Sequence, residues 1–356
     1  MTHDPSARVS LLFASLFAAA TVAAGCGSSS GGNPVTGDDG GPGSEGGPMG
    51  DDAGDASDGG DGGAEGNGTI GTIQKVANDG TFGSPFDATP SPDGKTVYFT
   101  GIGSDGTGGV FSVAAAGGAV TRLDTGGALV SPFGITTSPD GKQLYVADPA
   151  ADDDTKNLYG AVFVLPASGG TPTVLGGTQG LAPRSVVVAG GNLFVTAGAD
   201  GMGGPGVYEA ALSGGMPTAV ATGAPFVDPS GVAVTQGGDV YVVDTLASGS
   251  HLASVILVHG GKASAFVPDL GVGYPAGCAL VQDESALLVS GIDRSSKTDV
   301  VYRISPLGAS PQVASFNKTI GSFYEAAGLH RALDADVYAW ADSSANGSGS
   351  VYLLSK

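Results

Sequence analysis

The chain has little cysteine and little positive charge. Only Cys26 and Cys278 occur among 356 residues, which excludes a framework of internal disulfides. The 14 Lys and Arg residues stand against 34 Asp and Glu residues, and the formal net charge is −20. Nucleic-acid backbones are bound by clustered Lys and Arg, so no nucleic-acid partner is expected. With four histidines in all, the sequence contains no Ser-His-Asp, phosphate-loop or Cys/His zinc pattern.

Long hydrophobic runs are also rare, and the clearest one lies at the start of the chain. Arg8 precedes an apolar run over residues 9–24, which ends at Ala23-Ala24-Gly25-Cys26. A charged start, a short apolar core and small residues before a cleavage site are typical of a secretory signal, and the run is too short for a comfortable membrane span. We therefore predict that residues 1–25 are a signal peptide.

These residues resemble a bacterial lipoprotein signal. The resemblance implies that Cys26 becomes the lipidated first residue of the mature protein, which would anchor the chain to a membrane of the bacterial cell envelope. The outer membrane or cell surface is the expected location, with the periplasmic side as the alternative. Ala23 stands where the pattern usually has Leu, and ordinary cleavage near the alanine-rich end is the competing interpretation.

The segment 26–68 follows the cleavage site and lacks the residues that build a core. From residue 27 onward it has no aromatic residue, no Leu, no Ile, no Lys and no Arg, and it contains nine acidic residues. Such a composition cannot bury enough apolar surface to offset the entropy of ordering. We predict a disordered Gly/Asp-rich tether between the lipidated cysteine and a folded domain.

Residues 69–356 contain six copies of one repeat. The centres of its most recognisable strand are Tyr98, Tyr145, Phe194, Tyr241, Leu288 and Tyr338, which are 47 to 50 residues apart. This is the period of a four-stranded propeller blade. The chain reaches residue 356 after the third strand of the sixth copy, whereas residues 72–77 stand where a fourth strand would stand. We therefore predict an all-β, six-bladed propeller, monomeric, with antiparallel blades and with its last blade closed by residues 72–77.

The motif Ser-Pro-Asp-Gly-Lys occurs at residues 91–95 and 138–142, and Asp148 and Asp244 end the segments Tyr-Val-Ala-Asp and Tyr-Val-Val-Asp. With these motifs residues 69–356 resemble the NHL, YncE-like and SMP-30/gluconolactonase group of propellers. The resemblance implies that the first strand of each blade lines the channel. It also implies that the loops between second and third strands share a face with the loops between blades. Since these are the long loops, we expect any site on that face.

Two groups of residues are candidates on the long-loop face. Residues near the starts of the inner strands form the predicted binding face: Phe86, Phe133, Arg184, Asp228, Tyr274, Tyr324 and Glu325. Acids of the loops form a predicted acidic rim: Asp105, Asp148, Asp152, Asp153, Asp154, Asp200, Asp244 and Asp342. Of these, Asp148 and Asp152–Asp154 are candidates for a weak Ca²⁺ site.

The sequence favours a non-catalytic module that binds a protein, peptide or glycan through this face. The alternative is a divalent-metal-dependent hydrolase or lyase of the SMP-30 kind, for which Glu325 and Asp228 are the candidate ligands. His330, on an inner strand, is a further candidate, although a structural histidine is the simpler interpretation. Cys278, flanked by apolar residues, is expected to be a buried free thiol.

Overall fold

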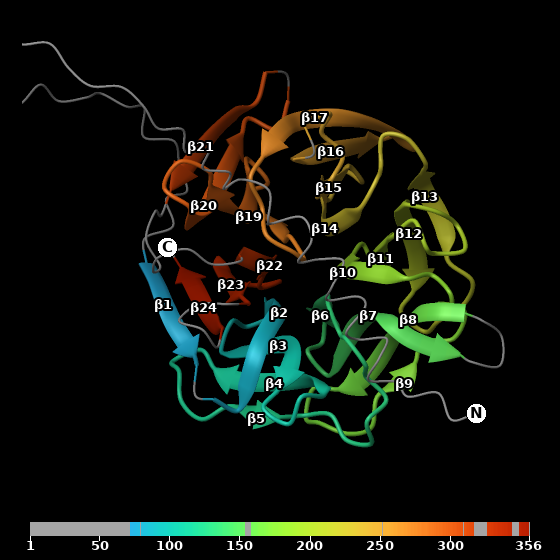
Figure 1. The fold of residues 1–356 in the computed structure, drawn as a ribbon, viewed down its shortest axis with the longest axis vertical. Coiled ribbons are helices and arrows are strands. Elements are labelled where there is room, and N and C mark those ends of the chain that lie inside the picture. Colours follow the sequence, from blue (N-terminus) through green and yellow to red (C-terminus); the bar gives the residue numbers. More distant parts are fainter. Residues whose placement is uncertain are drawn as a thin grey trace, which may run out of the picture. The chain divides into compact units, whose positions relative to one another are not determined.

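The computed structural model describes residues 72–355, except residues 79, 154–157, 251, 309, 317–325 and 344–348. Within this part of the chain the strands form six antiparallel sheets of four strands each. The sheets surround a central channel, with β2, β6, β10, β14 and β22 closest to it (Figure 1). The predicted all-β, six-bladed propeller is thereby confirmed.

Each of the first five blades is a run of four consecutive strands. Blade 1 has β2 (Phe82–Pro90), β3 (Thr96–Gly103), β4 (Gly108–Ala114) and β5 (Thr121–Arg122), and blade 2 has β6 (Ile135–Thr137), β7 (Gln143–Asp153), β8 (Leu158–Pro166) and β9 (Thr173–Val174). Blade 3 has β10 (Pro183–Ala189), β11 (Asn192–Ala197), β12 (Gly206–Ala211) and β13 (Thr218–Thr222), and blade 4 has β14 (Pro229–Val234), β15 (Val240–Asp244), β16 (Ala253–His259) and β17 (Lys262–Leu270). Blade 5 has β18 (Cys278–Leu280), β19 (Leu287–Asp293), β20 (Thr298–Ser305) and β21 (Gln312–Phe316).

Blade 6 is built from both ends of the domain. It contains β22 (Ala326–Arg331), β23 (Val337–Asp342), β24 (Ser350–Ser355) and, as its outer strand, β1 (Thr72–Ala77). Thr72 pairs with Ser355 and Ala77 with Val351, antiparallel, so the first strand lies beside the last one (Figure 1). The predicted closure by residues 72–77 is confirmed, and it covers the edge that β24 would otherwise expose.

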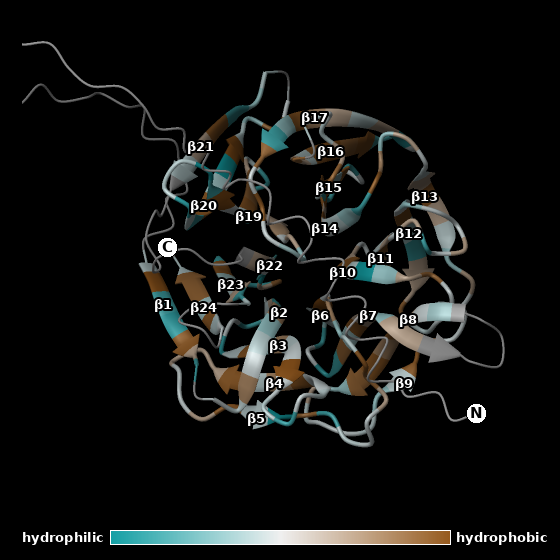
Figure 2. Cartoon of the chain, viewed as in Figure 1, coloured by the Kyte–Doolittle hydropathy of each residue, from teal (hydrophilic) through white to brown (hydrophobic). Residues whose placement is uncertain are grey.

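The hydrophobic core is divided among the interfaces between blades. The cluster between blades 4 and 5 includes Tyr241, Val255, Cys278 and Leu287, and comparable clusters lie between each other pair of neighbouring blades. Figure 2 shows hydrophobic residues concentrated on strands such as β4, β16 and β19 inside the blades. Cys278 is a buried free thiol, as expected, and burial raises the pKa of this thiol well above its usual range.

Tight turns join the first and second strands of the blades. In the turn after β2 the Gly94 amide donates to the Ser91 carbonyl at 2.9 Å, and Gly94 adopts φ 71°, which favours glycine. The Ser91 hydroxyl donates to Asp93, and this bond, together with Lys95, lowers the Asp93 pKa to about 2. The second Ser-Pro-Asp-Gly motif forms the same turn before β7. These turns define one face of the domain, here called the short-turn face.

Candidate functional site

Three aromatic residues of the predicted binding face meet over the channel at the long-loop face. The Phe86 and Phe133 ring centroids are 5.2 Å apart, and those of Phe133 and Tyr274 are 5.5 Å apart. Phe86 lies in β2 of blade 1, whereas Phe133 and Tyr274 lie in the segments leading into blades 2 and 5, so this aromatic cluster spans the channel rather than following one blade. Phe86 and Phe133 are buried, and burial raises the Tyr274 pKa well above its usual range, so the phenol is neutral and available as a donor.

An arginine and two acids lie next to the aromatic cluster. The Arg184 side chain is 11% exposed and forms ion pairs with Asp200, at 3.3 Å, and with Asp228, at 3.8 Å. Thr245 donates its hydroxyl to the Asp228 carboxylate at 2.7 Å. Burial opposes the charged form of Arg184, but the nearby Tyr274, Asp200 and Asp228 raise the pKa of its guanidinium. We call Arg184, Asp200 and Asp228 the charged cluster.

The aromatic and charged clusters together contain five of the seven residues of the predicted binding face. The other two, Tyr324 and Glu325, lie outside the described residues. So does Asp154 of the proposed Ca²⁺ site, and for Asp152 and Asp153 only the backbone position in β7 is described.

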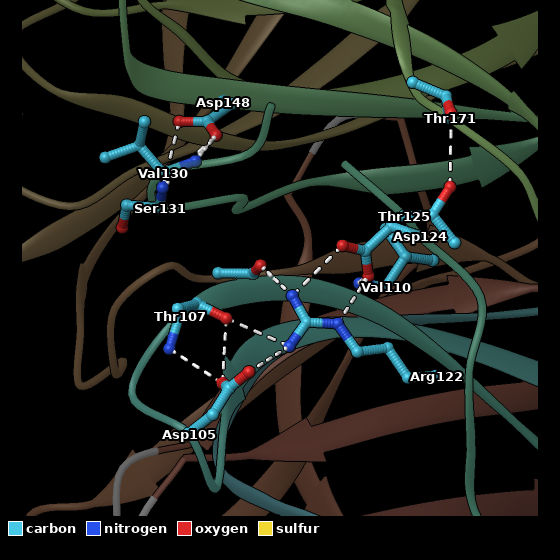
Figure 3. A network of polar contacts seen from close by, with 11 residues as sticks. Asp105, Thr107, Val110, Arg122, Asp124, Thr125, Val130, Ser131, Asp148 and Thr171 are labelled. Carbon is cyan, nitrogen blue, oxygen red and sulfur yellow. Dashed lines mark hydrogen bonds and ion pairs between the residues drawn. The ribbon is translucent and has the colours of Figure 1, made fainter. Parts of the chain in front are cut away.

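The acidic rim differs from expectation, because several of its acids are structural. Asp148 is 0% exposed, and its carboxylate accepts hydrogen bonds from the backbone amides of Val130 and Ser131 (Figure 3). It also accepts from the amides of Ala150 and Ala151. Burial raises its pKa, against the opposing effect of these amides. Asp148 therefore holds the loop leading into blade 2 instead of projecting from the rim. Its carboxylate oxygens already accept hydrogen bonds from amides, so they are not free to bind a cation.

Asp244 has the same role two blades later. It is fully buried and accepts hydrogen bonds from the amides of Val227, at 2.8 Å, and Asp228, at 3.0 Å. Asp342, at the end of β23, is fully buried too. The expectation that these three acids line an exposed rim is wrong, because all three are buried, and the loop backbone uses Asp148 and Asp244 as acceptors inside the fold.

The other three blades use a hydroxyl group of the second strand. Thr196 donates to the Ser230 carbonyl at 2.6 Å, and Ser290 donates to the Ala327 carbonyl at 2.5 Å. Thr100 donates in the same way to the Phe133 carbonyl. Each hydroxyl joins its blade to the segment of the next blade that borders the channel. Blades in which a hydroxyl makes this hydrogen bond thus alternate with blades that carry a buried carboxylate. The sequence analysis did not predict this alternation.

Exposed loop acids also have partners. Arg122 pairs with Asp105 at 2.9 Å and with Asp124 at 3.0 Å, and it donates to the Gly108 carbonyl (Figure 3). The backbone and hydroxyl of Thr107, together with Arg122, lower the Asp105 pKa. This network fixes the loop between β3 and β4 and contains no group left over for catalysis.

The candidate His330 lies inside the channel. Its Nε2 is 2.8 Å from Oδ2 of Asp87, which also accepts the Ile135 amide at 2.9 Å. Asp87 thus connects blade 1 with blades 2 and 6. A Cβ on Gly328 would lie 1.7 Å from Oδ1 of Asp87, so only glycine fits beside this carboxylate. His330 is structural in this contact, although its ring also borders a cavity described below.

The described residues do not fit a divalent metal at the long-loop face. They contain no group of three or more His, Cys, Asp or Glu side chains arranged to hold an ion. Asp228, the candidate ligand that is described, lies beside the Arg184 guanidinium, whose positive charge opposes a second cation. No helix among the described residues is long and apolar enough to cross a membrane.

Comparison with known proteins supports the fold. The NHL repeat family matches residues 226–252, which include β14 and β15. No curated protein matches the chain significantly. Similar solved structures include the PQQ-bound aldose sugar dehydrogenase of Streptomyces coelicolor, with 14% identity, a TM-score of 0.58 and coverage of 80% of this chain and 98% of that one.

Two further similar structures are propellers of enzymes. A glucose dehydrogenase-type oxidoreductase of Thermus thermophilus has 13% identity, a TM-score of 0.58 and coverage of 80% and 99%. A gluconolactonase of Xanthomonas campestris has 16% identity, a TM-score of 0.55 and coverage of 80% and 88%. At these identities the likeness establishes the fold and leaves the activity to be argued from the site.

Proposed function

We propose that the protein is a carbohydrate-directed enzyme that hydrolyses a small sugar lactone at the long-loop face. The observation that carries the proposal is the meeting of the aromatic cluster with Arg184 and Asp228 at one end of the channel. Tyr274, the partly exposed member of the aromatic cluster, offers a ring on which the apolar face of a sugar can pack, and a carboxylate beside it is the group that acid–base chemistry needs. The similar structures are named for enzymes of sugars and a sugar lactone, which favours catalysis over a non-catalytic scaffold.

Asp228 is the proposed general base. Its side chain is 21% exposed and is oriented by the Thr245 hydroxyl. In the proposed reaction Asp228 takes a proton from water as the water oxygen bonds to the lactone carbonyl carbon. The ring C–O bond then breaks, and the leaving oxygen receives the proton, giving the open hydroxy acid.

Arg184 is the proposed positioning residue. Its Nε and Nη1 atoms are buried and have no hydrogen-bond partner among the described residues. A buried guanidinium acts through its field, which is weakly screened there, and this field favours the negative charge that develops on the carbonyl oxygen. The same positive field also favours the negatively charged carboxylate of the product at the long-loop face. The proposal routes no step through a metal ion, for the reasons of fit given above.

The test is hydrolysis of D-glucono-δ-lactone by the full chain with and without EDTA. We expect turnover that survives EDTA, and a fall in kcat/KM of about 10² to 10⁴ for Asp228→Asn, the usual effect of removing a general base. Arg184→Gln should lower kcat more than it raises KM. Asp105→Asn is the matched control, because Asp105 is an acid of a nearby loop outside the site, and it should leave kcat/KM unchanged.

Other outcomes separate the competing functions. Binding of sugars or peptides by this face without turnover would instead support a non-catalytic binding module. Activity lost with EDTA and restored by a divalent ion would support the metal-dependent hydrolase with Glu325. Calorimetric titration with Ca²⁺ tests the acidic segment 152–154, where we expect only weak binding, on the order of 0.1 to 1 mM.

We also propose that the domain is held at the bacterial cell envelope by lipid on Cys26. The support is the apolar run 9–24 that ends directly before Gly25-Cys26, together with the acidic, glycine-rich segment that follows. An enzyme anchored in this way would meet its substrate outside the cytoplasm.

A further inference from the structure

A cavity lies at the opposite end of the channel from the aromatic cluster, at the short-turn face. Its volume is about 260 Å³, and its walls come from the inner strands of all six blades and the turns that follow them. The polar residues that line it include Thr89, Thr136, Thr137, Glu284, His330 and Arg331. The proposed enzyme site uses none of these residues. We call this space the short-turn cavity.

Three buried threonines of the cavity lack hydrogen-bond partners. Thr89, Thr136 and Thr137 are 2%, 6% and 9% exposed, and their hydroxyls make no side-chain hydrogen bond within the described part of the chain. Buried hydroxyls elsewhere in the domain, such as those of Thr178 and Thr196, are bonded to carbonyls. None of these three hydroxyls is among the fully buried polar atoms without a partner in the described part of the chain, so they face the open space of the cavity and can bond a molecule that enters it.

His330 adds a ring nitrogen to the same space. Its Nε2 is held by Asp87 at 2.8 Å, while Nδ1 has no hydrogen-bond partner among the described residues. The bond to Asp87 fixes the ring orientation, so Nδ1 is a positioned polar group in the cavity wall.

Glu284 stands where the other turns have glycine. In the turns after β2, β6 and β14 the closing residue donates its amide back across the turn and is Gly94, Gly141 or Gly238, with φ of 71°, 68° and 90°. In blade 5 the Glu284 amide makes the same bond to Val281 at φ 56°, a conformation that is strained for any residue with a Cβ. Unlike the glycines of the other turns, Glu284 brings a carboxylate to the wall of the cavity.

The charges around the cavity are balanced. The Glu284 carboxylate accepts the Gln236 amide at 2.9 Å through Oε1, and no described residue donates to its Oε2. Arg331, of opposite charge, also lines the cavity, and its guanidinium donates to the Ala332 carbonyl at 2.9 Å. One acid and one base therefore flank several groups that both donate and accept hydrogen bonds. This set suits a neutral molecule rich in hydroxyls.

We propose that the short-turn cavity is a second binding site, which takes a neutral polyol of monosaccharide size. The hydroxyls of Thr89, Thr136 and Thr137 and the Nδ1 of His330 would bond ligand hydroxyls, and Glu284 would accept from one or two more at the rim. A volume of about 260 Å³ is sufficient for one sugar ring. The inference does not depend on lactone hydrolysis at the other end of the channel.

The test is calorimetric titration of the full chain with D-glucose and D-xylose, with ethanolamine and acetate as charged probes. We expect saturable binding of at least one sugar and none of the charged probes. Thr137→Val, which removes a hydroxyl at nearly constant volume, should weaken sugar binding by about tenfold, as loss of a buried hydrogen bond does. Thr218→Val on exposed β13 is its matched control and should leave the affinity unchanged.

Glu284→Gly separates a binding role from a structural one. The substitution removes the strained backbone, so it should keep or raise Tm, and it should weaken sugar binding by about tenfold. Lys297→Gly relieves similar strain (φ 54°) at an exposed turn and should affect only Tm. Arg184→Gln should leave this binding intact, which distinguishes the two sites. Absence of sugar binding, binding of only a charged probe, or equal affinity in wild type and both cavity variants would overturn the proposal.

Discussion

At the scale of single residues, the domain depends on polar side chains that serve the backbone. Asp148 and Asp244 satisfy amides of the loops that lead into blades 2 and 4, and Thr196 joins blade 3 to blade 4. Such groups are buried, so their loss leaves donors without acceptors in a medium that cannot replace them. These residues determine how the loops of the long-loop face are held, and thereby where Arg184 and Asp228 lie.

Asp148→Ala is expected to destabilise the domain strongly. Four backbone amides lose their acceptor, and we expect the free energy of unfolding to fall by about 3 kcal/mol or more, as for other buried charged hydrogen-bond networks. Urea unfolding followed by circular dichroism measures the change. Asp105→Ala, at an exposed ion pair, should cost less than about 1 kcal/mol. Similar losses in the two variants would contradict the structural role of Asp148.

At the scale of elements, the pairing of β1 with β24 closes the ring. β1 supplies the outer strand of blade 6, and its Val76 and Ala77 are buried in the cluster between blades 6 and 1. Without it, β24 would present an unpaired edge and that cluster would lose one wall. β1 and β24 pair in one sheet although nearly the whole domain lies between them in the sequence. Their pairing therefore closes the ring as a whole.

Two truncations test the closure. Removal of residues 1–68 leaves β1 intact and should preserve one cooperative thermal transition. Removal of residues 1–80 deletes β1 and should lower Tm markedly and broaden the transition, because blade 6 then has three strands. Differential scanning calorimetry distinguishes the two. If both truncated proteins melted alike, β1 would not be the strand that holds the ring closed.

At the scale of the whole molecule, the chain combines a predicted anchor and tether with a propeller whose two faces differ. The long-loop face carries the aromatic and charged clusters, and the short-turn face carries the polar cavity. Between them Asp87, His330 and Gly328 pack tightly in the channel, so the two sites are separate. A ligand at one proposed site would therefore leave the other site empty.

The predicted anchor is tested with Cys26→Ala in the full chain. Without the thiol that accepts the lipid, the protein should move from the membrane pellet to the soluble fraction, and its intact mass should lack the acyl addition. Cys278→Ala is the matched control, because this thiol is buried in the propeller, and it should stay in the pellet. A Cys26→Ala protein that still pellets would show that ordinary cleavage or another contact explains its location.

Much of the architecture could be predicted from the sequence alone. The six copies, their spacing and the closing role of residues 72–77 are confirmed, because strand alternation and turn chemistry are local and repeat with a fixed period. The residues that start the inner strands also share one face by virtue of that repeat. For this reason Phe86, Phe133 and Tyr274 could be named together before their contacts were known.

Only the tertiary structure decided what each polar residue does. A sequence motif does not distinguish an exposed loop acid from a buried one whose carboxylate accepts hydrogen bonds from backbone amides. For this reason the prediction that Asp148 and Asp244 lie on an exposed rim is wrong. The contact of Asp87 with His330 joins residues 243 positions apart, and no local pattern encodes it. The short-turn cavity likewise exists only where six inner strands meet. The sequence determines the repeating elements because their interactions are local, whereas the sites arise from distances between blades, which only folding sets.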